Sequence, residues 1–342
     1  MSTLDTARMT TLLAPWAEHV YGDGTVVSGV APMPGNSGLS FGFAVHPHDG
    51  GIERLVIRLA PPGVRRRGNT DVLRQVPLLG ALARAGVSIA PLTWSTDDPQ
   101  WFGTDAIVQA HLDAEPFAMH APAGNRPDSA ERDASPYLRQ AVQALAPLHA
   151  IDWTAALPDW EEPRSVSAEV AFWARLLERT PDRAQVTAGT RLGQALAAHD
   201  PGGHRIGIFH GDYQTHNVLY DSRGSLTAVI DWEIAGIGPV GLDLGWLSMM
   251  TDPECWHAGR RAVLRTAADP EDLLRWYADA SGTDLPAYDW YRALACYRYG
   301  AIAAFNLHLH TSGRRVDEVS VLMGEGVPVL FDRGMGLLDP RG

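Results

Sequence analysis

Short apolar runs bounded by turn residues characterise the first third of the chain. They are rich in side chains that favour β-strands, and one of them is closed by Pro61, Pro62 and Gly63. The runs predict strands at 26–30, 39–45, 55–59 and 106–110. Between residues 71 and 85 the apolar positions instead follow a helical spacing. The first third therefore reads as a small β-sheet with a single helix, preceded by a short helix at 4–16.

Beyond Leu112 the pattern changes to long helical stretches. Residues 114–133 are rich in Pro, Ala, Gly and Asp and read as a loop. One compact β-rich island, residues 206–231, interrupts the helices. The helical spacing predicts helices at 136–150, 167–179, 190–198, 271–281, 288–312 and 318–334.

Charge and basic-residue usage narrow the possible chemistry. The chain has 342 residues and a net charge of −12 at pH 7, and all 28 of its basic residues are arginine. Without lysine, neither a Schiff-base enzyme nor a lysine-containing Walker A loop is possible. The excess of acidic over basic residues argues against binding to nucleic acid or to an anionic membrane, because both require clustered positive charge.

Cysteine content and hydropathy indicate a cytoplasmic protein. Cys255 and Cys296 are too few for a disulfide framework or a cysteine zinc site, and we expect both to be buried. The N-terminal residues lack the basic start and apolar run of a secretory signal. No uncharged apolar stretch approaches the roughly 18 residues that cross a membrane.

The β-rich island carries the candidate chemistry. A short apolar strand ends in His210-Gly211-Asp212, Asn217 opens a second strand, and a third strand ends in Asp231. Two carboxylates and one amide thus stand at strand ends around one turn. Metal-assisted phosphoryl transfer needs this set, because an Asp accepts the proton of the attacking hydroxyl while Asn and Asp oxygens hold Mg²⁺.

The spacing His210-Gly-Asp212-x4-Asn217, followed by Asp231, resembles the aminoglycoside phosphotransferase and choline kinase family. The flanking segments 148–153 and 231–247 resemble the family as well. Their sequences are most similar to those of kinase-like domains that stand alone in bacteria or are fused to acyl-CoA dehydrogenases. The resemblance implies an α+β, two-lobed protein-kinase-like fold. It further implies a nucleotide-binding lobe at 1–110, with an antiparallel sheet, and a mostly helical catalytic and acceptor-binding lobe at 111–342.

By this resemblance the protein is a small-molecule kinase that transfers the γ-phosphate of ATP or GTP, with Mg²⁺, to a hydroxyl group. Asp212 is then the catalytic base, and Asn217 and Asp231 are the metal ligands. Arg58 takes the place of the family's phosphate-binding lysine. The remaining nucleotide contacts fall to Gly35, Asn36, Ser37 and Gly38 in a loop between strands, and to Gln109 and His111, where the family binds the adenine edge.

One departure from the family pattern concerns the partner of Arg58. Gln75 stands where the family carries a glutamate that pairs with the basic residue, so the usual ion pair is missing. This departure motivates an alternative, a kinase-like protein that binds nucleotide or another ligand with little or no phosphotransfer.

Another alternative is a metal-dependent hydrolase built on His210, Asp212 and His216. In the kinase-like interpretation, which we favour, His210 anchors the catalytic loop by hydrogen bonding. The sequence does not identify the acceptor, which among relatives is an aminoglycoside, a macrolide, a hydroxyacyl-CoA ester or another metabolite, and it does not give the oligomeric state. The net negative charge favours a cationic acceptor only weakly.

Overall fold

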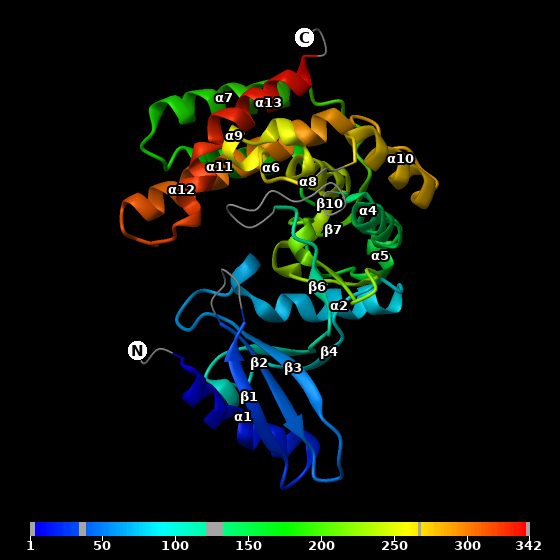
Figure 1. The fold of residues 1–342 in the computed structure, drawn as a ribbon, viewed down its shortest axis with the longest axis vertical. Coiled ribbons are helices and arrows are strands. Elements are labelled where there is room, and N and C mark those ends of the chain that lie inside the picture. Colours follow the sequence, from blue (N-terminus) through cyan, green and yellow to red (C-terminus); the bar gives the residue numbers. More distant parts are fainter. Residues whose placement is uncertain (1–3, 34–38, 121–132, 266–267, 340–342) are drawn as a thin grey trace. The chain divides into compact units, whose positions relative to one another are not determined.

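The computed structural model describes residues 4–33, 39–120, 133–265 and 268–339, and these form two compact units (Figure 1). The first unit comprises residues 1–115 together with the returning segment 227–234. The second comprises residues 116–226 and 235–342. From the sequence we expect the boundary between the two lobes at residues 110 and 111. The return of residues 227–234 to the first unit was not expected from the sequence.

The first unit is built on a five-stranded antiparallel sheet in the order β1-β2-β3-β5-β4. Helix α1 lies beside the sheet (Figure 1). The core forms between the two, where Trp16 packs edge-on against Phe43 and Trp94. Burial of these aromatic rings together with the aliphatic side chains of the same cluster stabilises the layer. The elements are α1 (Thr6–Tyr21), β1 (Val26–Pro32), β2 (Ser40–His46), β3 (Glu53–Leu59), η1 (Gly68–Thr70), η2 (Val72–Arg74), α2 (Gln75–Arg84), β4 (Leu92–Thr96), α3 (Pro99–Phe102) and β5 (Ala106–Ala110).

The returning segment of the first unit contains most of β9 (Leu226–Val229) and all of η4 (Trp232–Ile234). The backbone N–H of Val229 donates to the carbonyl of Ser88 at 2.8 Å, and Ile89 and Val229 form a parallel bridge. The indole Nε1 of Trp232 donates to the Val229 carbonyl at 2.9 Å. These bonds hold Asp231 and Glu233 on the first unit.

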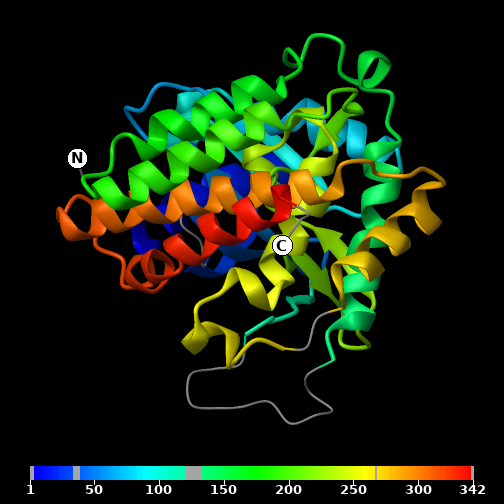
Figure 2. The same ribbon diagram turned by 90° about the horizontal axis from the view of Figure 1, so that it is seen from above.

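The second unit is mostly helical. Its longest helix, α11, is buried along most of its length, and α7, α11 and α13 lie side by side in Figure 2. The helices are α4 (Ser135–His149), α5 (Trp153–Ala156), α6 (Val166–Leu177), α7 (Arg183–Ala198), α8 (Gly241–Thr251), α9 (Ala258–Arg261), α10 (Pro270–Ser281), α11 (Tyr288–Thr311), α12 (Val319–Glu325) and α13 (Val327–Leu338), with 3-10 turns η3 (Thr215–Asn217) and η5 (Pro253–Cys255). The strands are β8 (Val218–Tyr220) and the antiparallel pair β7 (Ile206–Phe209) and β10 (Gly236–Pro239), while the two residues of β6 (Glu115–Pro116) are divided between the units.

Helix α8 packs closely against α11 because it presents glycine to it. A Cβ atom added at Gly241 or Gly245 would lie 2.3 or 2.6 Å from atoms of Tyr291. Larger side chains at these two positions would therefore push the helices apart.

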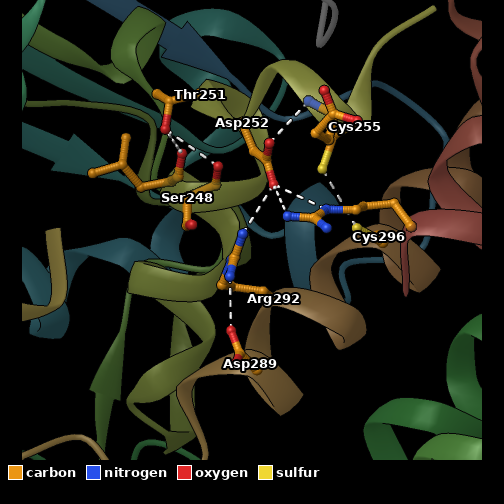
Figure 3. A network of polar contacts seen from close by, with 10 residues as sticks. Ser248, Thr251, Asp252, Cys255, Asp289, Arg292 and Cys296 are labelled. Carbon is orange, nitrogen blue, oxygen red and sulfur yellow. Dashed lines mark hydrogen bonds and ion pairs between the residues drawn. The ribbon is translucent and has the colours of Figure 1, made fainter. Parts of the chain in front are cut away.

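The C-terminal end of α8 is fixed by a buried ionic network, shown in Figure 3. Asp252 accepts hydrogen bonds from Arg292 of α11 at 2.9 Å and from Arg333 of α13 at 2.9 Å. Beside it the sulfur atoms of Cys255 and Cys296 lie 3.7 Å apart, and both thiols are free and buried, as the sequence predicts. The network ties three helices to one carboxylate.

No helix in the described part of the chain is both long enough and apolar enough to cross a membrane.

Candidate functional site

Asp212 lies in a loop that follows β7, and its carboxylate is held by several N–H donors of the second unit. Trp246 Nε1 donates to Oδ1 at 2.9 Å, and Gln214 Nε2 lies 2.9 Å from both carboxylate oxygens. Asn217 Nδ2 donates to Oδ2 at 3.1 Å and to the Asp212 carbonyl at 2.9 Å. The side chain is thereby fixed in one orientation while remaining partly exposed.

The geometry of Asn217 suits a ligand to a hard cation. Because its amide nitrogen faces Asp212, its carbonyl oxygen Oδ1 is the atom left to accept or to coordinate. The structure thus brings Asp212 and Asn217 together, as their spacing predicts.

The backbone just before Asp212 is braced by a buried carboxylate on α8. Asp243 is fully buried, and it accepts the N–H of His210 at 2.7 Å and the N–H of Gly211 at 2.8 Å. Its Oδ2 also lies 3.3 Å from Nε2 of His149. Since a carboxylate only accepts, this nitrogen donates to Asp243, and the other ring nitrogen, Nδ1, lies 2.9 Å from the hydroxyl oxygen of Tyr277.

A buried arginine holds the same loop from its carbonyl side. Arg298 of α11 donates to the Gly211 carbonyl at 2.9 Å, and its Nε lies 3.3 Å from Glu169 of α6. The guanidinium also lies over the rings of Trp173 and Trp246. This arginine was not among the residues expected from the sequence, and the signal for it is a charged residue within a mostly apolar stretch of a long helix.

His210 is fully buried, and its Nδ1 accepts the backbone N–H of Asp212 at 3.2 Å. This geometry suits an anchor of the loop and makes the ring inaccessible as a metal ligand. It therefore weighs against the hydrolase alternative. Within the described residues no three or more His, Cys, Asp or Glu side chains converge as a metal-binding group.

In the first unit Arg58 forms two ion pairs. From β3 its Nη2 lies 2.8 Å from both Asp231 Oδ1 and Glu233 Oε2. Burial alone lowers the pKa of Arg58, but the charges of Asp231 and Glu233 and the hydrogen bond to Asp231 outweigh burial and raise it. The guanidinium is therefore permanently charged.

The backbone of Asp231 is strained, with φ of +68° in a residue other than glycine. Such strain persists only where the surrounding structure holds the residue in place, and here the ion pair with Arg58 holds the carboxylate of Asp231. Gln75 stands where the family carries the acidic partner of the basic residue, and Arg58 pairs with the two carboxylates of the segment 231–233. Gln75 is buried at the start of α2.

Gln109 and His111 both belong to the first unit, in and just after β5. Gln109 Nε2 donates to the Ala90 carbonyl at 2.9 Å, so this side chain is engaged in holding the strand. In the described part of the chain, Nδ1 of His111 is buried and has no hydrogen-bond partner. A buried polar atom without a partner is uncommon in folded proteins. Gly35, Asn36, Ser37 and Gly38 lie outside the described residues.

Comparison with known proteins identifies the family. The sequence model of the phosphotransferase enzyme family, APH, matches residues 34–294. The chain belongs to this family. The resemblance deduced from the motif is thereby confirmed.

Curated relatives of this APH-family chain include a human protein, acyl-CoA dehydrogenase family member 11. It is 24% identical over 301 residues, which are 84% of this chain and 37% of that protein. The chain thus spans little more than a third of the length of this relative.

Solved structures establish the fold. A Ralstonia eutropha protein assigned as an aminoglycoside phosphotransferase has a TM-score of 0.74 at 19% identity, over 96% of this chain and 98% of that chain. The choline kinase LicA of Streptococcus pneumoniae has a TM-score of 0.61 at 13% identity, over 96% of this chain and 98% of that chain. The predicted α+β, protein-kinase-like fold is confirmed.

Proposed function

We propose that the protein is a small-molecule kinase that transfers the γ-phosphate of ATP or GTP to a hydroxyl group in the presence of Mg²⁺. The single observation that carries the proposal is the fixed carboxylate of Asp212, braced by Asp243 and Arg298 through the preceding peptides and facing Asn217. Family membership supports phosphotransfer in general.

In this function Asp212 accepts the proton of the acceptor hydroxyl as that oxygen attacks phosphorus. Its donors from Trp246, Gln214 and Asn217 keep the carboxylate oriented for this transfer. Asn217 and Asp231 are the residues we assign as ligands to Mg²⁺, whose preferred ligands are carboxylate and amide oxygens. The metal, when bound, neutralises charge on the phosphate.

Nucleotide recognition falls to the first unit. Arg58 supplies a permanent positive charge for the phosphates, and His111 offers a buried ring nitrogen for the base. We also assign Gly35, Asn36, Ser37 and Gly38 to phosphate binding and the strand around Gln109 to the base. A cytoplasmic location fits the nucleotide requirement and the two free thiols.

One observation favours the alternative, a protein that binds nucleotide with little turnover. The proposed phosphate ligand Arg58 already pairs with the proposed metal ligand Asp231. Bound nucleotide and metal would therefore compete with this ion pair for Nη2 of Arg58 and Oδ1 of Asp231.

The deciding experiment is a screen of hydroxylated acceptors for ADP or GDP release by the purified protein with Mg²⁺. The test variant is Asp212→Asn. Its matched control is Asp279→Asn, which changes an exposed aspartate on α10. We expect transfer that Asp212→Asn lowers by a factor of about 100 or more, since it removes the general base, and that Asp279→Asn leaves unchanged. Nucleotide binding without turnover on any acceptor would instead establish the alternative.

A further inference from the structure

A small cavity opens in the second unit next to the loop that carries Asp212. Its volume is about 40 Å³, and its lining includes Gln214, His216, His120 and Arg260. Gln214 connects the cavity to the proposed catalytic base, because its Nε2 lies 2.9 Å from both carboxylate oxygens of Asp212. A group bound in the cavity is therefore one side chain away from Asp212.

Arg260 of α9 gives this cavity a positive charge that no carboxylate among the described residues neutralises. Among the described residues it forms no ion pair with a carboxylate, whereas Arg261 beside it pairs with Glu254 at 3.2 Å. The guanidinium of Arg260 lies over the ring of Trp256, 4.6 Å from its centroid, and its Nε donates to His120 at 3.2 Å. The remaining N–H donors of its planar fork are available to a ligand.

His120 adds a hydrogen-bond donor to the same wall. Its Nε2 accepts from Arg260, so the proton of the neutral ring sits on Nδ1. Burial, Arg260 and His216 together lower the pKa of His120 to about 4. The ring is thus neutral at pH 7, and the guanidinium of Arg260 is the fixed charge of the cavity wall.

The size of the cavity restricts what it can accept. A water molecule requires about 10–15 Å³ of cavity volume. A cavity of about 40 Å³ therefore holds a few water molecules or one compact group, and not a whole acceptor molecule. An oxyanion matches both the volume and the unneutralised guanidinium, with which it forms charge-assisted hydrogen bonds. An ammonium group would meet Arg260 as a like charge.

We propose that this cavity binds a compact anionic group of the acceptor, a carboxylate or a phosphate, through Arg260 with His120 and His216. The phosphorylated substrate is accordingly a hydroxylated small molecule that carries an anionic group, in spite of the net charge of −12 on the chain. The inference rests on the proposed phosphotransfer function, because it describes the acceptor side of the same site.

The first experiment compares acceptors that share a hydroxyl and chain length and differ only in the terminal group. The probes are short hydroxyalkanoic acids, the matching amides and amino alcohols, together with glycerol and glycerol phosphate. We expect kcat/KM for the anionic member of a set to exceed that of its neutral and cationic members by tenfold or more. The hydroxy acids and glycerol phosphate distinguish a carboxylate from a phosphate as the bound group.

Variants assign the preference to the cavity. Arg260→Gln reduces the ratio of acid to amide to less than threefold, and Arg260→Lys, which keeps the charge but not the fork, retains part of it. Arg261→Gln is the matched control, and it keeps the full ratio. A wild-type enzyme that uses amides or amino alcohols as well as acids, or an Arg260→Gln variant with an unchanged ratio, overturns the inference while phosphotransfer itself stands.

A binding measurement without nucleotide separates failure of the inference from failure of the proposed function. Malonate and inorganic phosphate are titrated against the wild-type protein and Arg260→Gln, with the melting temperature as the readout. We expect a saturable increase for the wild type with at least one of the two anions, and its loss in the variant. No increase, or an equal increase in both proteins, overturns the anion site even if no acceptor is ever turned over.

Discussion

Asp243→Asn is the most informative single substitution in the second unit, because it keeps the shape of a buried side chain and changes only its hydrogen bonding. In the native chain three N–H donors reach the carboxylate, from His210, Gly211 and His149. Asparagine has one acceptor oxygen and an amide that itself donates. One backbone N–H therefore loses its acceptor in a fully buried place.

The cost follows from these three bonds. A buried donor left without an acceptor costs about 1–3 kcal/mol, and loss of the negative charge weakens each remaining bond by about 1 kcal/mol. We therefore expect the free energy of unfolding of the second unit to fall by about 3–5 kcal/mol. With a urea m value of about 3 kcal/mol per molar, this lowers the midpoint by about 1 M or more.

The assay is urea unfolding followed by tryptophan fluorescence, with phosphotransfer measured at low temperature, where the variant is still folded. The rate should fall at least about tenfold, since the affected peptides precede Asp212. The control is Asp182→Asn, which also faces two backbone N–H groups, at the exposed start of α7, where asparagine caps a helix equally well. An Asp243→Asn variant as stable and as active as this control would refute the reasoning.

Two further predictions concern charge. Arg58→Met removes both ion pairs of the guanidinium, and we expect kcat/KM for the nucleotide to fall about hundredfold; an unchanged value in steady-state kinetics would contradict the assignment of Arg58 to the phosphates. His120 binds a proton less readily in the folded chain, where its pKa is about 4, than in the unfolded chain, where it is 6.5. Stability is therefore lost as the pH falls from about 6.5 towards 4, by about 2 kcal/mol at pH 5. Urea midpoints at pH 7 and pH 5 should show a smaller loss for His120→Gln, and equal losses in both proteins would show that another group is responsible.

Most of the predicted elements are present, and the differences have physical causes. The single helix expected at 318–334 is two helices, α12 and α13, because Gly324 and Gly326 are followed by Pro328, which stands in the first turn of α13. Helix α7 begins at Arg183 rather than 190, with Asp182 as its N-cap.

Two elements, helix α8 and strand β4, could not be predicted from the local pattern of polar and apolar residues. Helix α8 is buried on nearly every side, so its sequence lacks the alternation of polar and apolar faces by which a surface helix is recognised. Strand β4, at Leu92–Thr96, mixes threonine and serine with two apolar residues and lies at the edge of the sheet. Both are stabilised by tertiary packing that a local pattern does not contain.

In the candidate site, too, local groupings could be predicted from the sequence and long-range pairs could not. Residues close together in the sequence, such as Asp212 and Asn217, could be grouped from their spacing alone. Partners that arrive from distant segments could not: Arg298 lies 87 residues from Gly211, and Glu233 lies 175 residues from Arg58. A single sequence records which residues are present and leaves such long-range pairs to the fold.

The discontinuity of the first unit has a consequence for the order in which the protein forms during synthesis. Its sheet is complete once residue 115 has left the ribosome, but Asp231 and Glu233 belong to the returning segment 227–234. Residues 116–226 of the second unit must be made before Arg58 can meet either carboxylate. A fragment ending at residue 115 would carry that arginine without these two counter-charges, so the first unit is not a module that can be excised by a single cut.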